Sequence, residues 1–103
     1  MIRIEIRSDK GMLELAIKGH AGYAPIGYDI VCSAVTSTAY TLAAYAEKQG
    51  TAQCIRLDPG DILIKAEDTE KMRTAFELIG CGLRMIANTY PENVMVVETP
   101  NLT

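Results

Sequence analysis

The sequence has few residues of the kinds that build metal sites and disulfides: three Cys, one His and no Trp among 103 residues. Cys32, Cys54 and Cys81 form no Cys-x-x-Cys pair, and an odd number leaves at least one thiol unpaired within the chain. A single His is too few for a zinc site of ordinary spacing, and it excludes metalloprotease motifs, which need paired His. We therefore expect a reduced protein with no metal, in which a functional Cys acts through its thiol.

Other missing features narrow the class of protein further. No apolar run approaches the roughly 20 residues that a membrane-spanning helix needs. Residues 1–10 alternate Ile with Arg and Glu, whereas a signal peptide has one continuous apolar run. A net charge of -3 argues against nucleic-acid binding, and the glycine-rich nucleotide motifs are absent. We expect a cytoplasmic protein with no cofactor and with no membrane or nucleic-acid partner.

The residues that are present suit one globular domain covering 1–103. Hydrophobic residues make up 49% of the chain, and no segment rich in Pro, Gly or Ser is long enough to be a linker. Alternation of apolar and charged residues predicts strands on both sides of the turn at 8–11. A second pair of strands, 54–57 and 62–66, flanks an Asp-Pro-Gly-Asp turn, and 94–97 predicts a last strand.

Two helices separate these strands. The first should run from about 30 to 49, because Asp29 is a good N-cap and Gly50 a good stop. The second should cover roughly 70–90 and end before Pro91. The order ββαββαβ predicts an α+β fold with a mostly antiparallel sheet and both helices packed on one face. The other face of the sheet is either exposed or covered by a second subunit.

His20 and Cys32 are the candidate catalytic residues. His20 ends a strand, and Cys32 lies in the first turn of the next helix, where the helix dipole and unpaired N–H groups favour a thiolate. An imidazole nearby can take the thiol proton and return it to a leaving amine, while the free N–H groups could hold an oxyanion. The other interpretation is that Cys32 is a small core residue and His20 only bonds the backbone.

Several residues around this pair have both a functional and a structural interpretation. Asp29 either orients His20 or simply caps the helix, and Thr36 either lines the site or bonds back to its own helix. The loop 21–28 is either a rigid turn or a lid on the site, with hinges at glycines and contacts from tyrosines. The candidate substrate-binding or supporting residues of the site, besides Asp29 and Thr36, are Gly19, Gly22, Tyr23 and Gly27. Cys54 and Cys81 lack a local His, so we interpret both as packing residues.

One segment resembles the signature of the ribosomal-processing cysteine protease family. That signature reads Gly-His-Ala, a short loop, and then Gly-x-Asp-Ile-Val-Cys-Ala-Ala-Val-Ser. The present chain has Gly-His-Ala at 19–21 and Gly-Tyr-Asp-Ile-Val-Cys-Ser-Ala-Val-Thr at 27–36. Ser33 replaces the usual Ala, and Thr36 replaces the usual Ser. Residues 79–94 are similar to the family's second helix and final strand, so the resemblance covers nearly the whole chain.

The resemblance implies that His20 and Cys32 are a catalytic pair in a cysteine endopeptidase. The implied substrate is the N-terminal extension of the twenty-seventh protein of the large ribosomal subunit, cut after apolar and aromatic residues. The resemblance also implies a homodimer and adds phage capsid or scaffold proteins as candidate substrates. The alternative is a non-catalytic, dimeric, ribosome-associated assembly module. A thiol-dependent redox protein is a third interpretation, which lacks a second Cys near the first.

Overall fold

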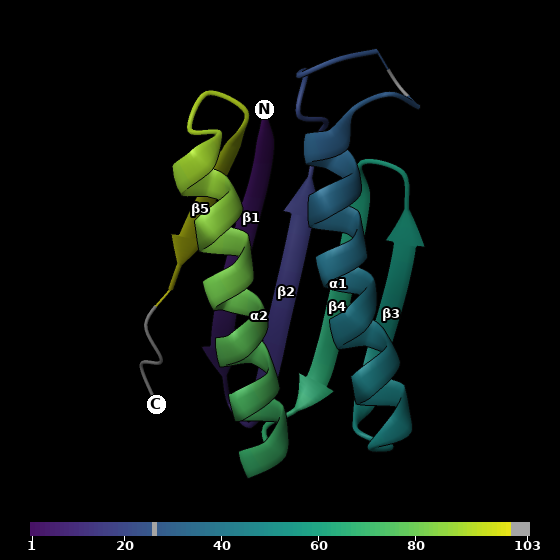
Figure 1. The fold of residues 1–103 in the computed structure, drawn as a ribbon. Helices are drawn as coiled ribbons and strands as arrows, with labels where there is room; N and C mark the ends of the chain where they lie inside the picture. Colours follow the sequence, from purple (N-terminus) through teal and green to yellow (C-terminus); the bar gives the residue numbers. More distant parts are fainter. Residues whose placement is uncertain (26, 100–103) are drawn as a thin grey trace.

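The computed structural model describes residues 1–25 and 27–99, which form five strands and two helices (Figure 1). The element order ββαββαβ is the predicted one, and the α+β class is confirmed. The helices are close to their predicted bounds because their caps are local sequence features. The elements are β1 (Ile2–Asp9), β2 (Met12–Lys18), α1 (Ile30–Lys48), β3 (Ala52–Asp58), β4 (Asp61–Glu67), α2 (Glu70–Thr89) and β5 (Val94–Glu98).

The five strands form one sheet in the order β3-β4-β2-β1-β5. The pairs β1–β2, β2–β4 and β3–β4 are antiparallel, and β5 lies parallel to β1. Both helices cover the same face of this sheet, as Figure 1 shows. The predicted arrangement, a mostly antiparallel sheet with two helices on one face, is therefore confirmed.

The core lies between the sheet and the two helices. In β1 the apolar residues Ile2, Ile4 and Ile6 are buried, while the charged residues between them point to the opposite face. Leu42 of α1 and Leu83 of α2 are fully buried against this layer. Burying a side chain of this size contributes about 1.5–3 kcal/mol, so the period-two pattern of the strands decides which face of the sheet carries the helices.

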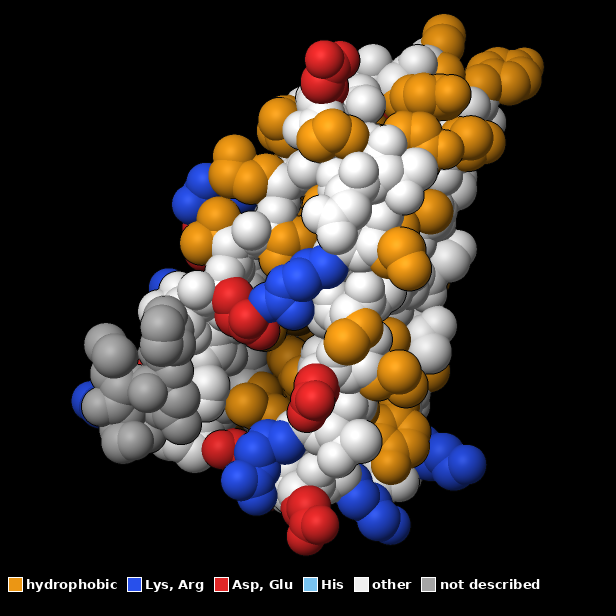
Figure 2. All heavy atoms as spheres, turned by 60° about the vertical axis from the view of Figure 1, so that its left-hand side comes forward, with side chains coloured by type: hydrophobic (Ala, Val, Ile, Leu, Met, Phe, Trp, Pro, Cys, Tyr) orange, Lys and Arg blue, Asp and Glu red, His pale blue; other side chains and the backbone are white. Residues whose placement is uncertain are grey.

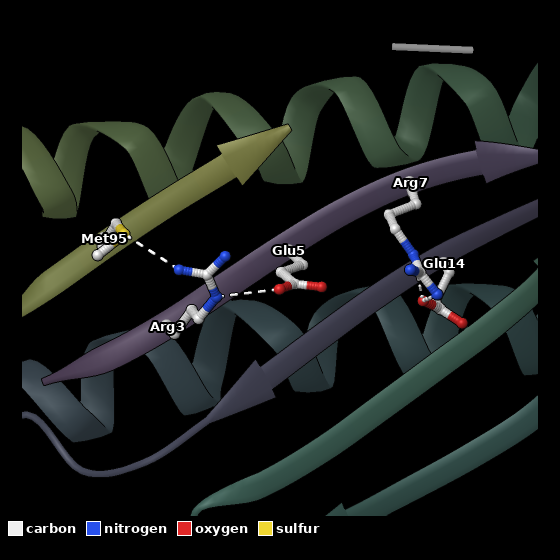
Figure 3. A network of polar contacts seen from close by, with 5 residues as sticks. All are labelled: Arg3, Glu5, Arg7, Glu14 and Met95. Atoms are coloured by element: carbon white, nitrogen blue, oxygen red, sulfur yellow. Dashed lines mark hydrogen bonds and ion pairs between the residues drawn. The ribbon is translucent and has the colours of Figure 1, made fainter. Parts of the chain in front are cut away.

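The opposite face of the sheet carries charged side chains. Arg3 pairs with Glu5 at 2.9 Å and Arg7 pairs with Glu14 at 2.7 Å (Figure 3). The Arg3 guanidinium also reaches the Met95 sulfur at 3.5 Å. Exposed ion pairs of this kind contribute only about 0–1 kcal/mol each, so they keep this face polar rather than hold the fold together.

The helical layer has a mixed surface. Figure 2, with the side of β5 and α2 turned forward, shows hydrophobic side chains spread among charged and polar ones. Leu78 and Met85 of α2 and Tyr40 of α1 are exposed large apolar residues. The described helices include none that is long and apolar enough to cross a membrane.

Candidate active site

The predicted catalytic residues lie at the same end of the sheet. His20 lies just beyond the end of β2, and Cys32 is the third residue of α1. Both line a cavity of about 390 Å³ between the end of β2, the start of α1 and the turn that joins β3 to β4. The predicted site residues that line this cavity are Gly19, His20, Gly22, Gly27, Asp29, Cys32 and Thr36.

The Cys32 sulfur is half-buried and has a backbone donor. The N–H of Ala21 donates a hydrogen bond to Sγ at 3.2 Å. Ala21 is itself almost fully buried, with 2% of its surface exposed, and its carbonyl accepts a hydrogen bond from Asn93 Nδ2 at 2.9 Å. Asn93, which lies 72 positions further along the chain, thus helps to hold Ala21, whose N–H faces the Cys32 thiol.

Asp29 is the N-cap of α1, as predicted, and it also holds the loop. Its Oδ1 accepts the N–H groups of Val31 and Cys32, both at 3.0 Å. Its Oδ2 accepts those of Tyr23 and Ala24 at 3.0 and 3.3 Å. Burial of the carboxylate acts to raise the pKa of Asp29, but these four backbone hydrogen bonds outweigh it and hold the pKa below its usual value.

These contacts bear on two expectations about Asp29 and the helix start. The described hydrogen bonds of its carboxylate all come from backbone groups and none from His20, so capping is the interpretation that the geometry favours. The expectation that free N–H groups of the first turn would hold an oxyanion is wrong for Val31 and Cys32. Their N–H groups already donate to Asp29, because a strong N-cap satisfies those donors first.

His20 is held through its backbone and through the turn between β3 and β4. The N-terminal ammonium of Met1 donates to the His20 carbonyl at 2.7 Å, and the N–H of Gly19 donates to the Gly60 carbonyl at 3.0 Å. The imidazole itself lies over Gly60, where a Cβ atom would be 2.8 Å from Nε2. The side chain of His20 is exposed, so Gly60 borders the imidazole on one side only.

The turn that carries Gly60 is the part of the site that sequence reasoning missed. Pro59, Gly60 and Asp61 all line the cavity, whereas the sequence identified them only as hairpin chemistry. The missing information was the pairing of β2 with β4, which places Lys18 beside Asp61. A Pro-Gly turn gives no signal by itself that it will lie against a His far earlier in the chain.

The loop 21–28 is anchored in its first half. Asp29 binds two of its N–H groups, and the ring of Tyr23 packs edge-on against Tyr90 with ring centres 5.4 Å apart. Tyr23 is not among the described residues that line the cavity, so a direct role in gripping substrate has no support there. Tyr28 is 81% exposed, and Ile26 lies outside the described residues.

The other two cysteines lie away from this cavity. Cys54 is half-buried in the edge strand β3. Cys81 is exposed on α2, so its interpretation as a packing residue is wrong: the helix turns it outward, between the two glycines on either side. Within residues 1–25 and 27–99, no three His, Cys, Asp or Glu side chains gather as a possible metal site.

Comparisons with known proteins show which family the chain is similar to. A family model described as cysteine protease Prp matches residues 1–95. The ribosomal processing cysteine protease Prp of Mycoplasma genitalium is 32% identical over 99 residues, which are 95% of this chain and 96% of that protein. Two solved structures are also similar to this chain.

The essential ribosomal processing protease Prp of S. aureus, in complex with a covalently linked product peptide, has a TM-score of 0.83 to this chain. It is 22% identical, and the match covers 96% of this chain and 100% of that one, which shows a shared fold. SMU.848 from Streptococcus mutans has a TM-score of 0.72 at 28% identity, over 96% of this chain and 94% of that one.

Proposed function

Because the chain belongs to the cysteine protease Prp family, it is a cysteine protease, and we propose that Cys32 and His20 are its catalytic pair. The observation that carries this proposal is that both side chains line one cavity, with the Ala21 N–H directed at the Cys32 sulfur. Of the three cysteines, only Cys32 lines this cavity together with the single His, and it lies at the start of a helix.

In the proposed reaction the Cys32 sulfur attacks the scissile carbonyl carbon while His20 takes the thiol proton. The tetrahedral intermediate collapses, the C–N bond breaks, and His20 gives that proton to the leaving amine. The product is a thioester between Cys32 and the N-terminal part of the substrate. Water then attacks the thioester while His20 removes a proton from the water, the C–S bond breaks to release the acid, and His20 returns the proton to the Cys32 sulfur.

The shape of the cavity supports an extended peptide with an apolar residue at the cut. Gly22 and Gly27 leave space for a substrate backbone because they have no side chain. Ile2, Ile17 and Ile62 form an apolar part of the wall. Thr36 adds a hydroxyl from α1. These features suit apolar or aromatic side chains before the scissile bond, as the family resemblance implies.

We further propose that the substrate is the N-terminal extension of the twenty-seventh large-subunit ribosomal protein, met in the cytoplasm. The name of the Mycoplasma relative supports a ribosomal protein as the substrate class. The alternative of a non-catalytic assembly module loses its support, because the family is one of proteases. The homodimer and the phage substrates stay predictions.

The test is to incubate the chain with the extended ribosomal protein and to read the cleavage products by mass spectrometry. Cys32→Ala should abolish cleavage and stay folded, because this half-buried residue lies in the first turn of α1 rather than deep in the core. Cys54→Ala and Cys81→Ala are matched controls that should retain activity. Cleavage by Cys32→Ala at the wild-type rate would show that the nucleophile lies elsewhere.

A further inference from the structure

The turn between β3 and β4 forms a support for the imidazole of His20. Gly60 is at a backbone φ of +68°, which L side chains rarely adopt, and its carbonyl accepts the N–H of Gly19 at 3.0 Å. A Cβ atom at this position would lie 2.8 Å from Nε2, 3.0 Å from Cε1 and 3.5 Å from Cδ2 of His20. The ring therefore occupies the space that the missing side chain leaves.

The turn is fixed mainly by backbone pairing, of β3 with β4 and of β4 with β2, and its exposed ion pairs add little to this. Asp61 Oδ1 accepts hydrogen bonds from Lys18 Nζ of β2 at 2.7 Å and from Arg56 Nη2 of β3 at 3.0 Å. These two cations hold the pKa of Asp61 below its usual value, chiefly through the Lys18 hydrogen bond, so the carboxylate stays charged and paired. The His20 side chain is exposed, so in this contact the imidazole is the group that would move.

We propose that Gly60 is a positioning residue for His20: the bare backbone at this turn sets where the imidazole lies relative to Cys32. The inference rests on the proposed function for its catalytic consequence. A Cβ at Gly60 would push the ring out of its place while the fold and the rest of the cavity remain. Substrate contacts from the loop and α1 would persist, whereas proton transfer between Cys32 and His20 would suffer.

The test compares Gly60→Ala with Gly50→Ala. Gly50 follows α1 with the same φ of +68°, but a Cβ added there would have no described atom within 4 Å, so this variant carries the same backbone strain without the contact. We expect Gly60→Ala to lower kcat by roughly 10²-fold, the loss that a displacement of about 1 Å can cause, with KM little changed. Gly50→Ala should keep both values near wild type.

Two readouts work without substrate, so they separate this inference from the proposed function. His20 is the only His of the chain, so its ring signals in an NMR spectrum of untagged protein are unambiguous. Gly60→Ala should shift these signals and slow the alkylation of Cys32 by iodoacetamide, resolved by peptide mass spectrometry. If wild-type protein fails to cut the ribosomal protein, the proposed substrate is wrong, while these readouts still decide the role of Gly60.

The inference is overturned if folded Gly60→Ala has wild-type ring signals and wild-type Cys32 reactivity. If Gly60→Ala does not fold, Gly60→Asn replaces it, because Asn tolerates a positive φ and still carries a Cβ. Unchanged ring signals in folded Gly60→Asn would overturn the inference as well. Loss of folding in both variants, with Gly50→Ala folded, would show that Gly60 serves the fold rather than the ring.

Discussion

Replacing Asn93 with Ala removes the one side-chain donor that holds Ala21 among the described residues. Asn93 Nδ2 donates to the Ala21 carbonyl at 2.9 Å, and Ala21 is 2% exposed. An unsatisfied buried carbonyl costs about 1–3 kcal/mol. Asn93 is only half-buried, so water can enter in place of its amide, and we take the lower end, about 1 kcal/mol. For a domain of this size that loss lowers Tm by about 4–8 °C.

The same substitution should also lower the reactivity of the Cys32 thiol. The Ala21 nitrogen lies 3.2 Å from the Cys32 sulfur, so freeing the Ala21 carbonyl loosens the N–H donor that faces the proposed nucleophile. If the whole loss of about 1 kcal/mol falls on the reactive arrangement, the rate of cleavage drops about fivefold. The alkylation rate of Cys32 by iodoacetamide should fall with it, since both reactions use the same sulfur.

The assay combines thermal unfolding with site-resolved alkylation and the cleavage rate of the extended ribosomal protein. Asn88→Ala is the matched control: it removes an exposed amide near the end of α2 and should leave all three measurements near wild type. An unchanged Tm together with unchanged Cys32 reactivity in Asn93→Ala would refute the argument that this distant turn supports the site.

Two further predictions concern Asp29 and the loop. The folded-state pKa of Asp29 lies below its usual value, so its charged form stabilises the fold at neutral pH, and that contribution is lost as pH falls through and below about 4. The gap in denaturant midpoint between wild type and Asp29→Asn should therefore shrink on acidification, and a constant gap would contradict this. In hydrogen exchange, the amides of Tyr23 and Ala24, which donate to Asp29, should exchange more slowly than the amide of Gly27. A substrate peptide added to Cys32→Ala should slow the exchange of the Gly27 amide. Uniform fast exchange across 21–28 would instead support a lid that moves as a whole.

Local features of the sequence predicted the elements and, to within one residue, the ends of both helices, whereas β3 begins at Ala52 rather than at the predicted residue 54. The alternating Ile residues of β1 fix one apolar face, and a cap side chain fixes the start of each helix. Asp29 accepts the N–H groups of Val31 and Cys32, and Thr69 accepts that of Met72. These signals act over two to four residues, so they can be identified without knowing which strands pair.

The supports of the site could not be predicted in the same way, because they depend on strand pairing. Gly60 comes to His20 only because β4 pairs with β2, and Asn93 comes to Ala21 only because β5 lies parallel to β1. Neither pairing has a local signature in the sequence. The exposure of Cys81 also could not be predicted from local sequence, since it depends on which side of α2 packs on the sheet.

The way the first turn of α1 is capped also bears on how the thiol of the proposed pair would be activated. The sequence suggested that the helix end itself would favour a thiolate, yet Asp29 places a negative charge there and occupies the N–H groups of Val31 and Cys32. The remaining described donor to the sulfur is the Ala21 N–H. In the proposed pair, activation then depends on His20, and each half has its own proposed support: Gly60 for the ring, and Asn93, through Ala21, for the sulfur. Both supports come from chain segments well outside the motif at 19–36, so the motif by itself does not set the geometry on which its reactivity depends.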